Sequence, residues 1–210
     1  MSTVHLESVD DAKNVAGFSD EFFAPVLVVA HLSVANELSS AEREKLQAPS
    51  NGNALDGDAD DAALQALCAA FLKQGVELVN KHMWGNLCAA LYVPPAVQSA
   101  LEREVQAAVD ALRCGAVAVN RGTFAPAMMP QGMWGGYQGA DTSMANPRSG
   151  VGAAYNTMLF DHPQKQALWF DFKPDAELAM AGPIPALVAK PLVGALTGGV
   201  AGVLTALQPF

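Results

Sequence analysis

Three short apolar runs constrain what this chain can fold into. They span Pro25 to Leu32, Leu87 to Val93 and Ala116 to Val119. Each is too short for a helix but long enough for a strand that is buried on both faces. Segments of helical periodicity separate them, and the order strand, helix, strand, helix, strand requires crossover connections. We therefore predict an α/β fold in which three or four mostly parallel strands are flanked by helices.

The two predicted helices follow from the spacing of apolar residues. The first is capped by Asp61 and continues its apolar stripe to Met83, although Gly75 weakens it. The second begins at Pro95, because proline is well suited to the first position of a helix, and its apolar face ends at Leu112. Gly115 then supplies the stop.

Two polar or irregular regions flank these elements. Residues 39–61 are polar and contain repeated Asp, Asn and Gly, so they predict a loop or a disordered insertion. Residues 176–210 form an apolar tail rich in Gly and Pro, without a charge from Pro191 onward. This uncharged stretch barely reaches the ~20 residues that a bilayer requires, and its glycines make a poor helix, which argues against membrane insertion. Between the two regions, residues 166–172 alternate as an edge strand does.

Composition excludes several classes of partner. The chain has 210 residues, of which 51% are hydrophobic, and a formal net charge of −9. This acidity argues against nucleic acid and against anionic membrane surfaces as partners. Three widely spaced cysteines without a Cys-x-x-Cys pair indicate neither disulfides nor a zinc site and favour a reducing compartment. Residues 1–11 do not resemble a signal peptide, so we expect a cytoplasmic location.

The sequence predicts neither a thiol nucleophile nor a metal site. Cys68 and Cys88 lie within apolar stripes, and Cys114 follows a predicted helix C-terminus, where the helix dipole disfavours a thiolate. Residues 56–61 begin like a calcium loop, but the sixth position is Asp and the twelfth is Leu67. The four histidines are too far apart in sequence to suggest a set of metal ligands, and a cluster of histidines brought together by folding stays open.

Four segments carry a resemblance to a known family. They are Asp-Glu-Phe-Phe-Ala-Pro-Val from Asp20, Gly-Ala-Val-Ala-Val-Asn ending at Asn120, Trp-Gly-Gly from Trp134, and Ser-Gly-Val-Gly from Ser149. In this order they resemble the C-terminal part of the catalytic domain of aldehyde dehydrogenases. We call them the four landmarks. The resemblance runs from about Asp20 to about Lys165 and is interrupted by residues 39–61.

The resemblance implies a role for several residues. In the family, the glutamate at the position of Glu21 binds the hydroxyls of the nicotinamide ribose, and the phenylalanine at Phe23 packs beside the nicotinamide ring of NAD or NADP. The aromatic at the position of Trp134 lines the aldehyde pocket in the family. A tryptophan that only packs in the hydrophobic core of the loop region is an equally good interpretation. We expect Asn120 to organise the following loop through its amide, and Ser149–Gly152 to form a tight turn.

The family places its nucleophilic cysteine, its general base and its nucleotide-binding domain upstream of the first landmark. We therefore interpret residues 1–175 as part of an aldehyde dehydrogenase catalytic domain, from a fragment or from one half of a split enzyme. Its partner is then the missing N-terminal half, or a second copy through the edge strand at 166–172. The alternative is a non-catalytic interaction module derived from the same domain.

Overall fold

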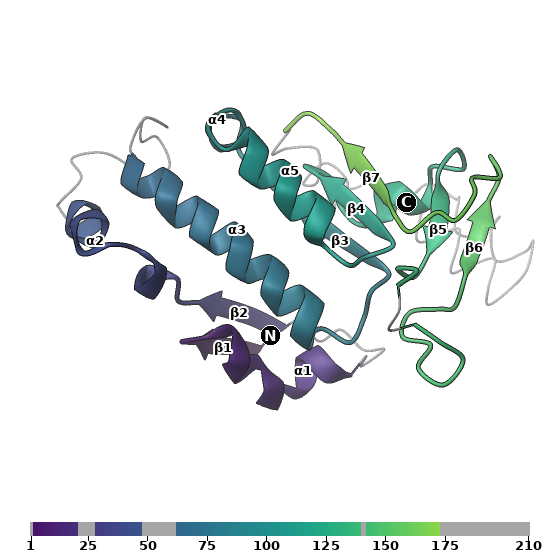
Figure 1. The fold of residues 1–210 in the computed structure, drawn as a ribbon, viewed down its shortest axis with the longest axis horizontal. Coiled ribbons are helices and arrows are strands. Elements are labelled where there is room, and N and C mark those ends of the chain that lie inside the picture. The colour runs from purple at the N-terminus through teal and green to yellow at the C-terminus, as the bar shows by residue number, and fades with distance from the viewer. Residues whose placement is uncertain (1, 21–27, 48–61, 140–141, 173–210) are drawn as a thin grey trace, which may run out of the picture. The chain divides into compact units, whose positions relative to one another are not determined.

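The computed structural model describes residues 2–20, 28–47, 62–139 and 142–172 (Figure 1). One compact unit comprises Met1–Phe170, and a second comprises Asp171–Phe210. The second unit lies almost wholly outside the described residues, so the account below concerns the first.

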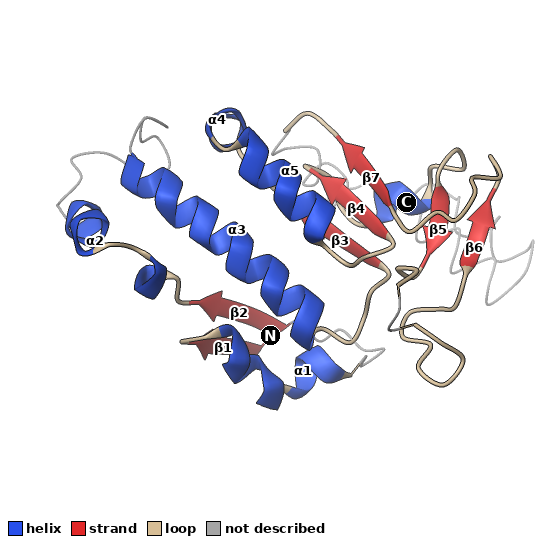
Figure 2. Ribbon diagram, in the orientation of Figure 1, coloured by secondary structure: helices blue, strands red, loops and turns tan. Residues whose placement is uncertain are grey.

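The first unit contains both helices and strands (Figure 2). The N-terminal elements are β1 (Ser2–Leu6), the 3-10 helix η1 (Val9–Asn14), α1 (Ala16–Ser19), β2 (Val28–Leu32), the 3-10 helix η2 (Ala35–Glu37) and α2 (Ser40–Gln47). The central elements are α3 (Ala62–His82), β3 (Cys88–Leu91), α4 (Pro95–Ala100), α5 (Glu102–Ala111) and β4 (Ala116–Val119). The last are α6 (Phe124–Ala127), β5 (Met133–Gly135), β6 (Ala153–Asn156) and β7 (Gln166–Trp169).

The strands form three small sheets. β3, β4 and β7 make a parallel sheet in that order, with β7 at an edge, as its alternating sequence predicts. β1 and β2 make a separate parallel pair, and β5 pairs with β6 in the antiparallel direction. The α/β class and the crossover connections are therefore confirmed. The expectation that the strand within 25–32 joins the central sheet is wrong, because β2 pairs with β1 instead.

Helix α3 lies at the centre of the packing. Three buried apolar clusters occur in the described residues, and each contains side chains of α3. Val76 and Val79 pack with β4 and α5, Leu78 packs with β1 and β2, and Leu72 packs with Leu101 and Val105. Figure 1 shows α3 and α5 side by side. By length and composition alone, α3 is also long and apolar enough to cross a membrane.

Two local features differ from the sequence prediction, whereas the continuity of α3 through Gly75 agrees with it. Residues 40–47 form the helix α2 where we predicted a loop or insertion, while residues 48–61 lie outside the described residues. A capping box explains α2, because Ser39 and Glu42 exchange hydrogen bonds between side chain and backbone. The helix predicted from Pro95 is divided at Leu101, whose backbone (φ −123°, ψ 36°) is not helical. Gly75 weakens α3 by propensity but does not interrupt it.

A half-buried lysine joins the sheet to α5. Lys165, next to β7, donates hydrogen bonds from Nζ to the carbonyls of Val109, Asp110 and Leu112 at 2.6, 2.5 and 3.0 Å. These carbonyls have no partner within the helix at its C-terminus, where the dipole also favours a cation. Burial lowers the pKa of Lys165.

Asn120 ties together the carboxyl ends of the three parallel strands. Its Oδ1 accepts the N–H of Val93 at 2.7 Å, and its Nδ2 donates to the carbonyl of Phe170 at 3.4 Å and to Oε1 of Gln98 at 3.2 Å. Its own N–H donates to Leu91. The expectation that its amide organises the loop that follows is wrong, because the amide instead joins the ends of neighbouring strands.

The geometry of Asn120 predicts the effect of two substitutions. Its φ is 59°, a left-handed conformation that asparagine and glycine adopt more easily than alanine does. We expect Asn120→Ala to lower the free energy of unfolding by about 2–4 kcal/mol, because it adds backbone strain and leaves the buried N–H of Val93 without its acceptor. Asn120→Gly removes the same acceptor but adds no backbone strain, so it should lower the free energy of unfolding by about 1 kcal/mol less than Asn120→Ala does. Urea unfolding measures both, and equal losses would contradict the strain argument.

Candidate functional site

A buried asparagine binds several chain segments near the start of the central sheet. Asn86 is 1% exposed and lies between α3 and β3. Its side chain accepts the N–H of Ser149 at 3.1 Å, and its backbone N–H donates to Oγ of the same serine at 2.8 Å. Its carbonyl accepts the N–H groups of Gly115 at 2.9 Å and Tyr137 at 3.1 Å. The beginning of β3 therefore binds three chain segments that are remote from it in sequence.

Glycines allow these segments to touch through their backbones. A Cβ added at Gly115 would lie 1.9 Å from the carbonyl oxygen of Gly135, and one at Gly136 would lie 2.9 Å from that of Gly150. Gly150 and Gly152 have φ values of 139° and 82°, so the predicted tight turn is confirmed. The second, third and fourth landmarks therefore meet at Asn86.

An open pocket of about 470 Å³ adjoins this meeting point. Asp20, the first residue of the first landmark, and Ser149, the first residue of the last, both line it. The other lining residues come from α1, from the turn after α3, from β3 and from the residue before Ser149: they are Gly17, Phe18, Met83, Trp84, Gly85, Leu87, Cys88 and Arg148. The predicted cofactor residues Glu21 and Phe23 follow Asp20 directly but lie outside the described residues.

Trp134 lies elsewhere. It is half-buried on β5, opposite Tyr155 of β6, and it is not among the residues that line this pocket. Tyr155 is itself anchored, because its hydroxyl donates to the carbonyls of Pro126 and Ala127. The structure therefore brings Trp134 close to the second landmark through Gly135, but not onto the wall of the pocket that Asp20 lines.

Arg148 is a pocket residue that the sequence analysis did not identify. Its guanidinium donates to the carbonyls of Trp84 at 2.9 Å and Met83 at 2.6 Å, just after the C-terminus of α3. The sequence did offer a signal, because Arg148 is a cation between a proline and a predicted tight turn. Cations bind favourably at the C-termini of helices, which is where Arg148 lies. With Asp20 on the wall as well, the pocket presents one group of each charge to a polar ligand.

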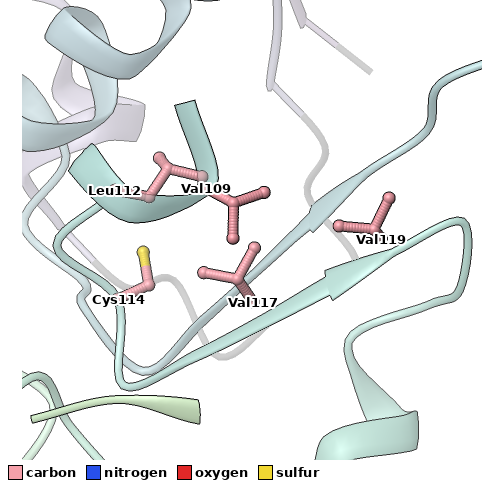
Figure 3. Close-up of a cluster of buried hydrophobic side chains, with 5 residues drawn as sticks. All are labelled: Val109, Leu112, Cys114, Val117 and Val119. Carbon is pink, nitrogen blue, oxygen red and sulfur yellow. The ribbon is translucent and has the colours of Figure 1, made fainter. Parts of the chain in front are cut away.

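The thiols of the described residues are poor nucleophiles. Figure 3 shows Cys114 among Val109, Leu112 and Val117. Burial, and to a smaller extent the neighbouring Cys88 thiol, raises the pKa of Cys114 to about 11. Burial also raises the pKa of Cys88 in the pocket and of Cys68 in α3. All three are therefore protonated at neutral pH, whereas nucleophilic attack requires the thiolate.

The described residues contain no group of three or more His, Cys, Asp or Glu side chains arranged to hold a metal ion. The pocket instead offers a carboxylate, a serine hydroxyl and a guanidinium beside Trp84, a set suited to hydrogen-bonding a polar organic ligand. No protein-family model matches the chain, and neither a curated protein nor a solved structure gives a significant match. The assignment of a function therefore rests on the residues of the site.

The contact between Gly115 and Gly135 predicts a strong effect of one methyl group. In Gly115→Ala the added Cβ meets backbone that cannot rotate away, so we expect a loss of about 3 kcal/mol or more in the free energy of unfolding. Gly75→Ala is the matched control, because a Cβ there has no atom within 4 Å and the position is helical. It should stabilise the chain by about 0.5–1 kcal/mol. Both values come from urea unfolding, and a neutral Gly115→Ala would contradict the close contact.

The buried thiol predicts a loss of stability at alkaline pH. The folded chain holds the Cys114 proton until about pH 11, whereas an exposed thiol releases it near pH 9. The contribution of this thiol to the free energy of unfolding is therefore complete below pH 9 and is lost as the pH rises toward 11. The expected loss is about 2–3 kcal/mol. Cys114→Ala should remove this part of the pH dependence, while Cys68→Ala, at a half-buried site, should retain it. Unfolding free energies between pH 8 and about 11 test this, and parallel curves for wild type and Cys114→Ala would contradict it.

Proposed function

We propose that this chain supplies the C-terminal part of an aldehyde dehydrogenase catalytic domain, the part that binds the nicotinamide ribose and borders the aldehyde pocket. One observation carries the proposal. The four landmarks extend from Asp20 to Gly152 in the sequence, yet three of them meet at Asn86 and the first begins at the pocket beside it. Packing alone does not require those particular segments to converge.

The cofactor in this proposal is NAD or NADP. The carboxylate of Glu21 would accept hydrogen bonds from the two ribose hydroxyls, and such charge-assisted bonds are stronger than neutral ones. Phe23 supplies a flat apolar face for the nicotinamide ring. Support comes from Asp20, which lines the pocket and precedes Glu21 by one residue. We assign Trp134, which precedes Gly135 at the glycine contacts, to the aldehyde.

The nucleophile comes from another segment or another chain. In aldehyde oxidation a thiolate adds to the carbonyl carbon, hydride passes to the nicotinamide, and water hydrolyses the thioester with the help of a base. The raised pKa values of Cys68, Cys88 and Cys114 make the described thiols unsuited to the first step. The complete enzyme therefore combines this chain with a part that carries the cysteine, the base and the nucleotide-binding domain.

A second function has one observation in its favour. An open groove of about 470 Å³ between α3 and α5 is lined mainly by alanine and by the apolar parts of longer side chains, and Phe71 of α3 is 52% exposed. Exposed apolar surface of this kind is typical of protein-binding surfaces. A non-catalytic interaction module that uses this groove is the alternative to the dehydrogenase component.

Activity measurements separate the two functions. The chain alone should show no NAD(P)-dependent aldehyde oxidation above background, and it should bind NAD with a Kd of about 1 mM or weaker, since two ligand contacts do not offset the entropy of association. Adding the N-terminal part of an aldehyde dehydrogenase that carries the cysteine should restore NADH formation. In the restored enzyme, Glu21→Ala should raise the KM for NAD about tenfold or more without weakening assembly.

A surface variant provides the control for that experiment. Glu102→Ala changes an exposed acid of α5 that does not line the pocket beside Asn86, and it should leave the KM for NAD unchanged. Assembly that never restores activity would favour the interaction module. Robust turnover by the isolated chain would contradict the proposal.

A further inference from the structure

The pair β1–β2 has two different faces. Alternate side chains of a strand point to opposite sides, so one face carries Val4, Leu6, Val28, Ala30 and Leu32, which pack in one apolar cluster with Phe18 and α3. The other face carries the intervening residues, among them His5 on β1 and His31 on β2. The burial of the first face fixes the direction in which both imidazoles point.

The two histidines are register partners. His5 lies opposite His31 in the parallel pair, and both side chains are exposed. Their rings are stacked with centroids 4.9 Å apart and an angle of 16° between the ring planes. Two imidazoles from different strands are therefore held side by side at the surface.

We propose that His5 and His31 form a binding site for a divalent transition-metal ion of the Zn²⁺, Cu²⁺ and Ni²⁺ class. Neutral imidazole nitrogen is a preferred ligand of these ions. Metal–nitrogen bonds are about 2.0–2.1 Å long, so two coordinating nitrogens lie about 3.4 Å apart at a tetrahedral ion. Stacked rings on neighbouring strands reach this separation by tilting toward each other, without a change in the backbone.

The site is open on the solvent side. No third His, Cys, Asp or Glu among the described residues joins the pair in a group that could hold a metal. Water therefore completes the coordination shell, and the ion is bound reversibly rather than as a structural metal. This proposal does not depend on the dehydrogenase assignment, since neither histidine belongs to a landmark or lines the pocket beside Asn86.

The site also couples metal binding to strand pairing. An ion held by one ligand from β1 and one from β2 binds the paired state and not the separated strands, so it stabilises the folded chain by mass action. At a free metal concentration about one hundred times the Kd, we expect the midpoint of thermal unfolding to rise by about 5 °C or more.

The experiment is a titration of the full chain, free of any affinity tag, with Zn²⁺ and with Cu²⁺. Calorimetry should give one ion per chain, and Cu²⁺ should broaden the imidazole NMR signals of His5 and His31 before those of the other histidines. His5→Asn and His31→Asn should each weaken binding about tenfold or more, because each removes half of the protein ligands. Both variants should lose the metal-dependent rise in thermal stability.

His162→Asn is the matched control. His162 is exposed and has a left-handed backbone (φ 48°), which asparagine also adopts, so this variant removes a surface imidazole without strain. It should bind metal as the wild type does. The proposal is overturned if the wild type does not bind either ion, if both His5→Asn and His31→Asn retain wild-type affinity, or if the first signals that Cu²⁺ broadens are those of His82 or His162. If a variant does not fold, the broadening pattern of the wild type decides the matter.

Discussion

The hydrogen bonds of the buried residue Asn86, through both its side chain and its main chain, are the interaction on which the arrangement of this chain depends. A buried polar group costs free energy unless its hydrogen-bonding atoms have partners, and the partners here come from three separate segments. Its main-chain carbonyl accepts the N–H groups of Gly115 and Tyr137. Its side chain and its own N–H bind Ser149. Moving any one of these segments would leave a buried donor or acceptor without a partner. The segments are therefore fixed by the requirement to satisfy one residue, and glycines provide the space in which they do so.

The sequence predicted those elements whose signals are local. α3, β3 and β4 follow from apolar spacing, and the turn at Gly150–Gly152 follows from its glycines. β1 was missed although its side chains alternate as those of a strand with one exposed face do, because the strand has only five residues and its partner β2 is remote. α2 was missed because its apolar content is low, although the capping box at Ser39 was readable.

The features of the site that could be predicted from the sequence are likewise the local ones. Glycine-rich landmarks indicate close backbone approach, but a single sequence does not reveal which segments approach one another. The roles of Asn86 and Arg148 depend on carbonyls and hydroxyls that lie far away in the chain or at the end of a helix. The stacking of His5 on His31 likewise depends on a strand register that no local pattern specifies. Glu21 and Phe23, the residues that the resemblance favours most, lie outside the described residues.

The central position of α3 has a consequence for the order in which the chain folds. The β1–β2 pair is at the N-terminus, yet the apolar cluster beneath it includes Leu78 and Met83, at the end of α3 and just beyond it. A two-stranded sheet is not stable without something packed on its apolar face. The β1–β2 pair therefore cannot acquire a stable partner surface until the chain has been synthesised through α3, and these contacts of large sequence separation slow folding through the entropy of loop closure. During synthesis the apolar face of the β1–β2 pair therefore remains exposed until α3 is available to cover it.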